Sequence, residues 1–118
     1  AIGCLVVDAL KAAEILKKDR IDVEVIDPRT LSPLDYKTII ESVKKTKRLI
    51  VADPGWQSFG AGAEIIAKIC ELRGKDMNSN PIRITLPDSH APMSQTLEKQ
   101  YHLDVNKIVK KIKDNFKK

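Results

Sequence analysis

The spacing of apolar and polar positions predicts alternating strands and helices along almost the whole chain. Apolar residues recur at helical intervals in five segments: 5–18, 33–47, 61–73, 94–102 and 104–116. Short apolar or alternating runs predict strands over 21–27, 49–52 and 82–86, and residues 1–4 are typical of the end of another strand. Such alternation favours a parallel sheet with helices on both faces. We therefore expect an α/β fold, a three-layer α/β/α arrangement with a mostly parallel sheet of about four to five strands.

Residues 32–35, Ser-Pro-Leu-Asp, give the clearest helix start in the sequence. Ser32 is a favourable N-cap, Pro33 suits the first helical position, and Asp35 completes the acidic form of a capping box. The sequence thus predicts a helix that begins directly after Ser32.

The 118 residues are enough for one domain. Only three complete strands are predicted inside the chain, which begins without Met in the middle of an apolar run. We expect residues 1–118 to form a single domain that lacks its first strand or strands, with the missing strand directly before Ala1.

The net charge of +5 comes mainly from the C-terminal end. Six lysines lie in the last twelve residues: Lys107, Lys110, Lys111, Lys113, Lys117 and Lys118. Basic and acidic residues nearly balance without them, so a solvated helix face is favoured over a nucleic-acid patch. No apolar run has the length of a membrane span, and Cys4 and Cys70 lie far apart in apolar surroundings. A reduced, cytoplasmic protein without a nucleic-acid or membrane partner is expected.

The stretch from Arg48 to Glu64 joins a strand to a helix through a loop with Gly55, Gly60 and Gly62. A helix start after such a loop can bind an anion. The spacing, however, is neither GxGxxG nor GxxxxGK[ST]. A tight strand-to-helix connection is therefore favoured, and a phosphate site remains the alternative.

Two acidic residues and one histidine are candidates for chemistry. Asp27 and Asp53 each follow a strand and precede a proline, so they fit a turn better than a carboxylate pair or a magnesium site. His90 follows Asp88 and Ser89, but adjacent residues cannot converge as a catalytic triad. No catalytic, cofactor-binding or metal residue is predicted.

Five residues are predicted to lie at an interface: Trp56, Phe59, His90, Met93 and Arg29. Loop aromatics are favoured at interfaces, although they can also fold back onto their own core. The residues alone indicate an assembly module or a piece of a larger enzyme.

Three motifs in order resemble the C-terminal, transketolase-type domain of the beta subunit of pyruvate dehydrogenase and related 2-oxoacid dehydrogenases. They span Val25–Asp35, Gly55–Ile65 and Ile82–Met93, and residues Asp104–Phe116 are similar to that family's last helix. The first motif also resembles transketolase, 1-deoxyxylulose-5-phosphate synthase and 2-oxoacid:ferredoxin oxidoreductase, which are alternatives. A free-standing anion-binding module is a further alternative.

The resemblance implies an enzyme that decarboxylates a 2-oxoacid with thiamine diphosphate and magnesium. It implies that the alpha subunit and an upstream thiamine-diphosphate-binding domain of the beta subunit, which this chain lacks, bind the cofactor. It implies that this domain binds neither and instead contacts the alpha subunit and a second beta subunit. It places the enzyme in the cytoplasm, or in the mitochondrial matrix of a eukaryote. In some members the domain also docks the lipoyl acyltransferase core. The lysine-rich end with Lys117 and Lys118 departs from this, because it would repel a basic docking domain.

Overall fold

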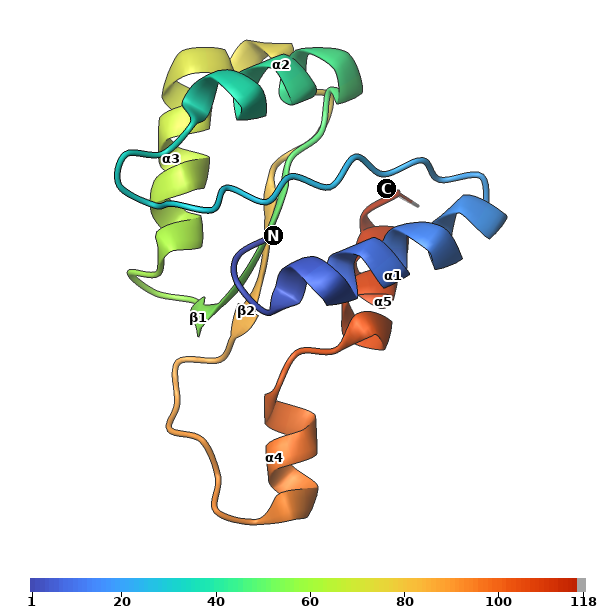
Figure 1. Cartoon of the computed structure of the whole chain (residues 1–118), viewed down its shortest axis with the longest axis vertical. Helices are drawn as coiled ribbons and strands as arrows, with labels where there is room; N and C mark the ends of the chain where they lie inside the picture. Colours follow the sequence, from blue (N-terminus) through green and yellow to red (C-terminus); the bar gives the residue numbers. More distant parts are fainter. Residues whose placement is uncertain (117–118) are drawn as a thin grey trace.

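The computed structural model describes residues 1–116 and confirms an α/β fold with a parallel sheet (Figure 1). Its elements are α1 (Leu5–Lys18), α2 (Tyr36–Thr46), β1 (Ile50–Trp56), α3 (Ala61–Arg73), the 3₁₀ helix η1 (Gly74–Asp76), β2 (Ile82–Leu86), α4 (Gln95–Tyr101) and α5 (Val105–Phe116). Within these residues the sheet has two strands, fewer than the four to five expected. Ile50 lies opposite Ile82 and Ala52 opposite Ile84. No helix in this part of the chain is long and apolar enough to cross a membrane.

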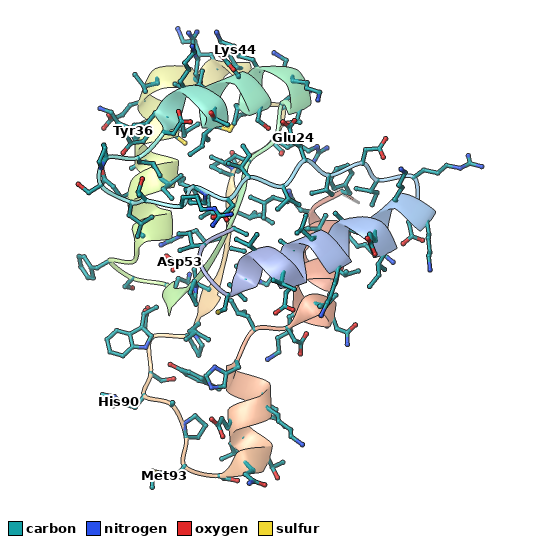
Figure 2. All side chains as sticks on the ribbon, viewed as in Figure 1. Glu24, Tyr36, Lys44, Asp53, His90 and Met93 are labelled. Atoms are coloured by element: carbon teal, nitrogen blue, oxygen red, sulfur yellow. The ribbon has the colours of Figure 1, made fainter. Side chains whose placement is uncertain are left out.

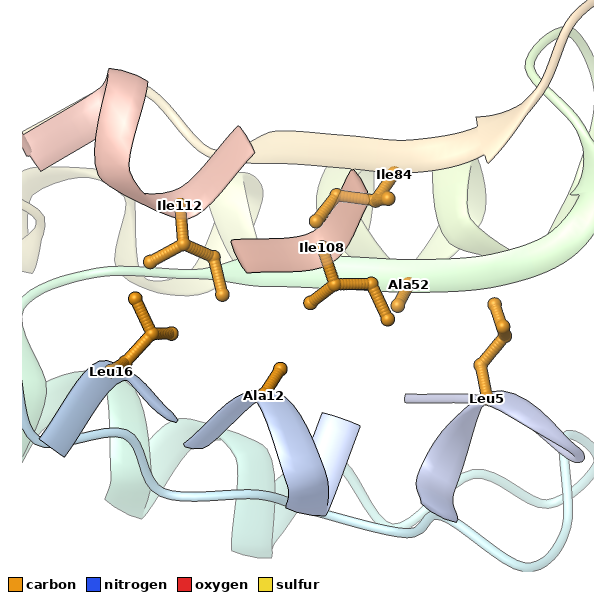
Figure 3. Close-up of a cluster of buried hydrophobic side chains, with 7 residues drawn as sticks. All are labelled: Leu5, Ala12, Leu16, Ala52, Ile84, Ile108 and Ile112. Carbon is orange, nitrogen blue, oxygen red and sulfur yellow. The ribbon is translucent and has the colours of Figure 1, made fainter. Parts of the chain in front are cut away.

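Helices pack on both faces of the sheet. On one face, α1 and α5 bury a cluster with Ala52 and Ile84 of the strands, as Figure 3 shows. Its members are Leu5, Ala12, Leu16, Ala52, Ile84, Ile108 and Ile112. On the other face, α2 and α3 bury Val51 with Ile39, Val43, Ile65 and Ile69. Neighbouring residues of a strand point to opposite faces, so Val51 and Ala52 belong to different layers of the core.

The cap of α2 differs from the sequence prediction. The helix begins at Tyr36, and its N-cap is Asp35 rather than Ser32. The Asp35 carboxylate accepts a hydrogen bond from the Thr38 backbone N–H at 3.1 Å and another from the Thr38 hydroxyl at 2.5 Å. Asp35 stands directly before the first helical residue, where a carboxylate reaches the unpaired N–H groups of the first turn. Ser32 stands four residues before Tyr36, too far along the chain to do so.

The predicted strand over residues 21–27 is wrong for the described chain, which forms no strand there. The alternation itself is present, because Val23 and Val25 are half-buried while Asp22 and Glu24 are exposed. A strand also needs a neighbour for its backbone groups. Within residues 1–116, the backbone of this segment makes two hydrogen bonds to other segments: Ile26 C=O accepts from the Ala1 N-terminus at 2.9 Å, and Ile21 N–H donates to Leu16 C=O of α1 at 3.1 Å. Neither belongs to a strand ladder.

Candidate interaction site at the ends of the two strands

The glycine-bearing loop between β1 and α3 surrounds one buried carboxylate, that of Asp53, which is 4% exposed. Its Oδ1 accepts the Gly55 N–H at 2.8 Å, and its Oδ2 accepts the Gly62 N–H at 2.7 Å. Gly62 lies in the first turn of α3, so the negative charge stands at the positive end of the helix dipole. The anion at this helix start is therefore part of the chain itself.

The glycines leave the space that this carboxylate needs. A Cβ on Gly60 would lie 2.6 Å from the Trp56 carbonyl oxygen, a contact that no alanine can make without movement of the backbone. A Cβ on Gly62 would lie 3.2 Å from Asp53 Oδ2. This geometry supports the tight strand-to-helix connection over the phosphate site, because a second anion would stand beside a buried carboxylate.

The structure gives the magnesium alternative no support. Both oxygens of Asp53 accept backbone N–H groups, and the exposed Asp27 pairs with Arg29 Nε at 2.9 Å. Residues 1–116 contain no group of three His, Cys, Asp or Glu side chains that could hold a metal ion.

Hydrogen bonds join the loop after β1 to the loop after β2. The Asp88 carboxylate accepts the Ser58 N–H at 2.8 Å and the Ser58 hydroxyl at 2.6 Å. Gln57 N–H donates to the Leu86 carbonyl at 3.0 Å, and Arg83 donates to the Gln57 carbonyl. The Ser58 hydroxyl, followed by its backbone N–H, holds the pKa of Asp88 below its ordinary value. The two loops thus form one structural unit.

Helix α4 is attached to this unit through Tyr101. The Trp56 indole N–H donates to the Tyr101 hydroxyl at 3.1 Å, and that hydroxyl donates to the Ser89 carbonyl at 2.7 Å. The His90 ring meets Trp56 edge-on, with 6.2 Å between the ring centroids. Sequence reasoning missed Tyr101, since a tyrosine at the end of a short polar helix carries no signal of a contact 45 residues away.

Four of the five predicted interface residues lie at the end of β1 or on these two loops, and we call Trp56, Phe59, His90 and Met93 the loop patch. All four are exposed, Trp56 at 51%, Phe59 at 104% and Met93 at 102%. Figure 2 shows His90 and Met93 pointing outward from the loop after β2. The exposed aromatic Phe59 also has a left-handed backbone, with φ of 57°. A bulky residue seldom adopts this conformation.

The fifth predicted residue, Arg29, lies apart from the loop patch. Its guanidinium is exposed and pairs with Asp27. No hydrogen bond within residues 1–116 connects it to the loops after β1 and β2. Arg29 and the patch are therefore separate features, although the sequence grouped them.

Replacement of Asp53 by alanine would leave two N–H groups without an acceptor, the buried one of Gly62 and the half-buried one of Gly55. We expect Asp53→Ala to lower the free energy of unfolding by about 2–4 kcal/mol. Denaturant unfolding followed by circular dichroism measures this loss. The matched control is Asp114→Ala, which removes an exposed carboxylate of α5 and should cost less than about 0.5 kcal/mol. Equal effects of the two substitutions would contradict the role of Asp53.

The Asp88–Ser58 contact predicts an unusually acidic carboxyl group. In an NMR titration, Asp88 should have a pKa below the ordinary value of about 3.9, and Ser58→Ala should raise that pKa. Because the pKa is lowered on folding, the contact stabilises the loops above the ordinary value, and this contribution disappears as the pH falls through the lowered pKa. Ser94→Ala is the control, since the Ser94 side chain makes no capping bond to α4. An Asp88 pKa at or above the ordinary value would show that the contact does not form.

Comparison with known proteins gives one family over nearly the whole chain. Residues 1–108 match the transketolase C-terminal domain. The chain is 46% identical to the pyruvate dehydrogenase E1 component subunit beta of Rickettsia conorii over 88% of this chain and 33% of the relative. The mitochondrial counterpart of Saccharomyces cerevisiae is 43% identical over 90% of this chain and 30% of the relative. The subunit beta of acetoin:2,6-dichlorophenolindophenol oxidoreductase of Bacillus subtilis is 42% identical over 92% of this chain and 32% of the relative.

The chain therefore spans about a third of the length of the curated relatives that it matches. The strands, the helices and the loops after β1 and β2 lie within the matched region, apart from residues 109–116, which form most of α5. This chain belongs to the transketolase C-terminal domain family, and it is similar to the beta subunits of pyruvate dehydrogenase E1 components.

Proposed function

We propose that this chain is the C-terminal assembly domain of the beta subunit of a 2-oxoacid dehydrogenase, within the component that decarboxylates the substrate. The full enzyme would use thiamine diphosphate and magnesium, which other regions bind. The partners of this domain would be the alpha subunit and a second beta subunit. The cytoplasm, or the mitochondrial matrix of a eukaryote, is the proposed location.

The loop patch is the observation that carries this proposal. Phe59 and Met93 are fully exposed, so neither contributes to the core of this chain. Exposed apolar side chains on two loops that are hydrogen-bonded to each other are typical of a surface that another protein covers. The strained backbone of Phe59 supports the same interpretation, because strain persists where a functional role maintains it.

The rigidity of the loops also supports a binding surface. The Asp88–Ser58 bonds and the Tyr101 bonds fix both loops to each other and to α4. A surface that is ordered before it meets its partner loses less conformational entropy on binding.

The lysine-rich end makes α5 a poor dock for a basic acyltransferase core. Lys107 donates to backbone carbonyls at the end of α4, including that of Gln100, and Lys113 pairs with Asp19 at 2.6 Å. Lys110 and Lys111 remain exposed. Lys117 and Lys118, which carried part of the sequence argument, lie outside the described residues. We propose that any docking of the acyltransferase core uses another surface.

Sequence identity to the relatives does not distinguish pyruvate from acetoin as the substrate of the full enzyme, because beta subunits of both kinds of enzyme match this chain at comparable identity. Since we place catalysis outside this domain, the isolated chain should turn over neither pyruvate nor acetoin when thiamine diphosphate and magnesium are added. The full-length beta subunit with its alpha subunit should turn over one of them, as followed by reduction of dichlorophenolindophenol. Turnover by the isolated chain would contradict the proposal.

Charges placed in the loop patch should prevent assembly without unfolding the domain. The double variant Phe59→Asp/Met93→Asp in the full-length beta subunit should lose most of its association with the alpha subunit, measured by size-exclusion chromatography with light scattering. Because both side chains are fully exposed, the melting temperature of the isolated domain should stay within the range of ordinary surface substitutions.

The matched control is Leu72→Asp, which charges an exposed apolar residue near the end of α3. Leu72 is 47% exposed, a fraction similar to the 51% of Trp56. It lies near the C-terminal end of α3, whereas the loop that carries Phe59 precedes the N-terminal end of that helix. This variant should assemble normally. Normal assembly of the double variant would refute the patch as a subunit interface, whatever the outcome for Leu72→Asp.

A further inference from the structure

Helix α4 and the loop before it extend away from the rest of the domain. Figure 1 shows α4 at one end of the molecule, beyond the helices that cover the sheet. None of its seven residues is buried, and Leu97, its one aliphatic residue, is 53% exposed. A helix this short is unstable on its own in water. Because α4 buries no side chain, polar contacts have to fix its position.

These polar contacts involve two side chains. Within residues 1–116, the hydrogen bonds that join α4 to β1, to the loop after β2 and to α5 all involve Tyr101 or Lys107. Tyr101 is the last residue of α4 and contacts Trp56 and Ser89. Lys107 lies in the first turn of α5, where its backbone N–H donates to Asp104 Oδ1 at 2.8 Å.

The Lys107 ammonium group binds the C-terminal end of α4. Its Nζ donates to the backbone carbonyls of Gln100 and His102 and, at 3.4 Å, to that of Lys99. The last carbonyls of a helix have no partner within the helix and form the negative end of its dipole, so a cation there is favourable. Gln100 and His102 flank Tyr101 in the sequence. Lys107 therefore fixes the backbone on both sides of this tyrosine.

The position of Lys107 is unfavourable within its own helix. A cation in the first turn stands at the positive end of the dipole of α5. Lys107 is nonetheless half-buried, and the next residue, Ile108, is 2% exposed and belongs to the core. This turn of α5 is thus a rigid base for the ammonium group. A residue that breaks a local rule often serves another part of the structure, which here is the end of α4.

We propose that Lys107 is a positioning residue of the loop patch. By binding the end of α4, its ammonium group holds the Tyr101 hydroxyl where it accepts the Trp56 indole N–H and donates to the Ser89 carbonyl. This chain of contacts connects the core at α5 to both loops that carry the patch. The role of Lys107 rests on the proposed function, because it keeps the proposed interface in the conformation that meets the partner.

Leu103 is the alternative anchor for α4. It lies between α4 and α5 and packs against the cluster of α1 and α5. Its side chain restrains the path of the chain, but it does not fix the backbone torsions between itself and Tyr101. The bonds from Lys107 act on the carbonyls directly before and after the tyrosine. Removal of the ammonium group while Leu103 stays in place distinguishes the two anchors.

The first readout is the indole N–H of Trp56, which gives a single NMR signal because the chain contains one tryptophan. Lys107→Met keeps the length of the side chain and removes its charge and its donors. In residues 1–118, this variant should shift the indole signal towards its position in Tyr101→Phe, which lacks the acceptor. The Tyr101 amide should exchange with solvent about tenfold faster, as expected for the loss of one bond to a charged group. The Ile108 amide should keep its protection, because the core is unchanged.

Two matched variants separate this role from a general effect of charge. Lys107→Arg keeps the charge and the donors, so it should retain the indole signal of the unchanged chain. Lys110→Met removes an exposed lysine from the same helix and should also leave the signal unchanged. In the full-length beta subunit, Lys107→Met should weaken association with the alpha subunit about tenfold, because the patch is no longer ordered before binding. Lys107→Arg and Lys110→Met should associate normally.

Three results would overturn the proposal. An unchanged indole signal in Lys107→Met would show that Leu103 alone positions α4. An equal shift in Lys110→Met would indicate a general effect of charge. Normal association of Lys107→Met, despite a shifted indole signal, would show that the interface does not depend on α4. The proposed function fails separately, if the double variant in the loop patch assembles normally, because the indole signal of the isolated chain involves no partner.

Discussion

The contact between the Asp53 carboxylate and the start of α3 determines how the chain leaves β1. It thereby shapes the surface formed by the loops after β1 and β2, which we call the strand-end surface. It joins Asp53 and Gly55 near the end of β1 to Gly62 in the first turn of α3. Without a buried acceptor, these N–H groups would be unsatisfied in the core. With it, residues 57–60 connect β1 to α3, and Trp56 at the end of β1 and Phe59 in the connection are exposed. A loop whose composition suggests anion binding thus has a structural role.

The strand-end surface combines rigid support with exposed apolar side chains. Ser58, Asp88 and Tyr101 hold the two loops in place, yet Phe59 and Met93 contact little of their own chain. Binding surfaces commonly lie on loops that a rigid scaffold positions. Between β1 and residues 21–27, by contrast, Ala1 and Ile2 supply the backbone hydrogen bonds within residues 1–116, one to Ile26 C=O and one to Ala52 C=O.

Periodicity predicted the elements whose stability comes from burial along one face. The spacing of Ile108 and Ile112 predicted α5, and the apolar run before Asp53 predicted β1, although β1 continues to Trp56. Prediction failed where the outcome depends on a neighbour distant in sequence. Residues 21–27 have the pattern of a strand but no partner to pair with.

In the candidate site, too, contacts between residues distant in sequence could not be predicted. The Asp-Pro-Gly turn indicates the Asp53–Gly55 bond, but nothing local indicates the Gly62 bond nine residues away or the link from Trp56 to Tyr101. The sequence left open whether Trp56 and Phe59 fold back onto the core, and the structure shows that both are exposed, as is Met93. That another subunit covers them stays a prediction.

Hydroxyl-radical footprinting with mass spectrometry tests this central claim most directly. The reactivity of Trp56 and Met93 would be compared between the isolated domain and the assembled enzyme, with the half-buried Met77 as an internal reference. Our account predicts a several-fold fall in the reactivity of Trp56 and Met93 on assembly and little change at Met77. Unchanged reactivity of Trp56 and Met93 in the assembled, active enzyme would contradict it.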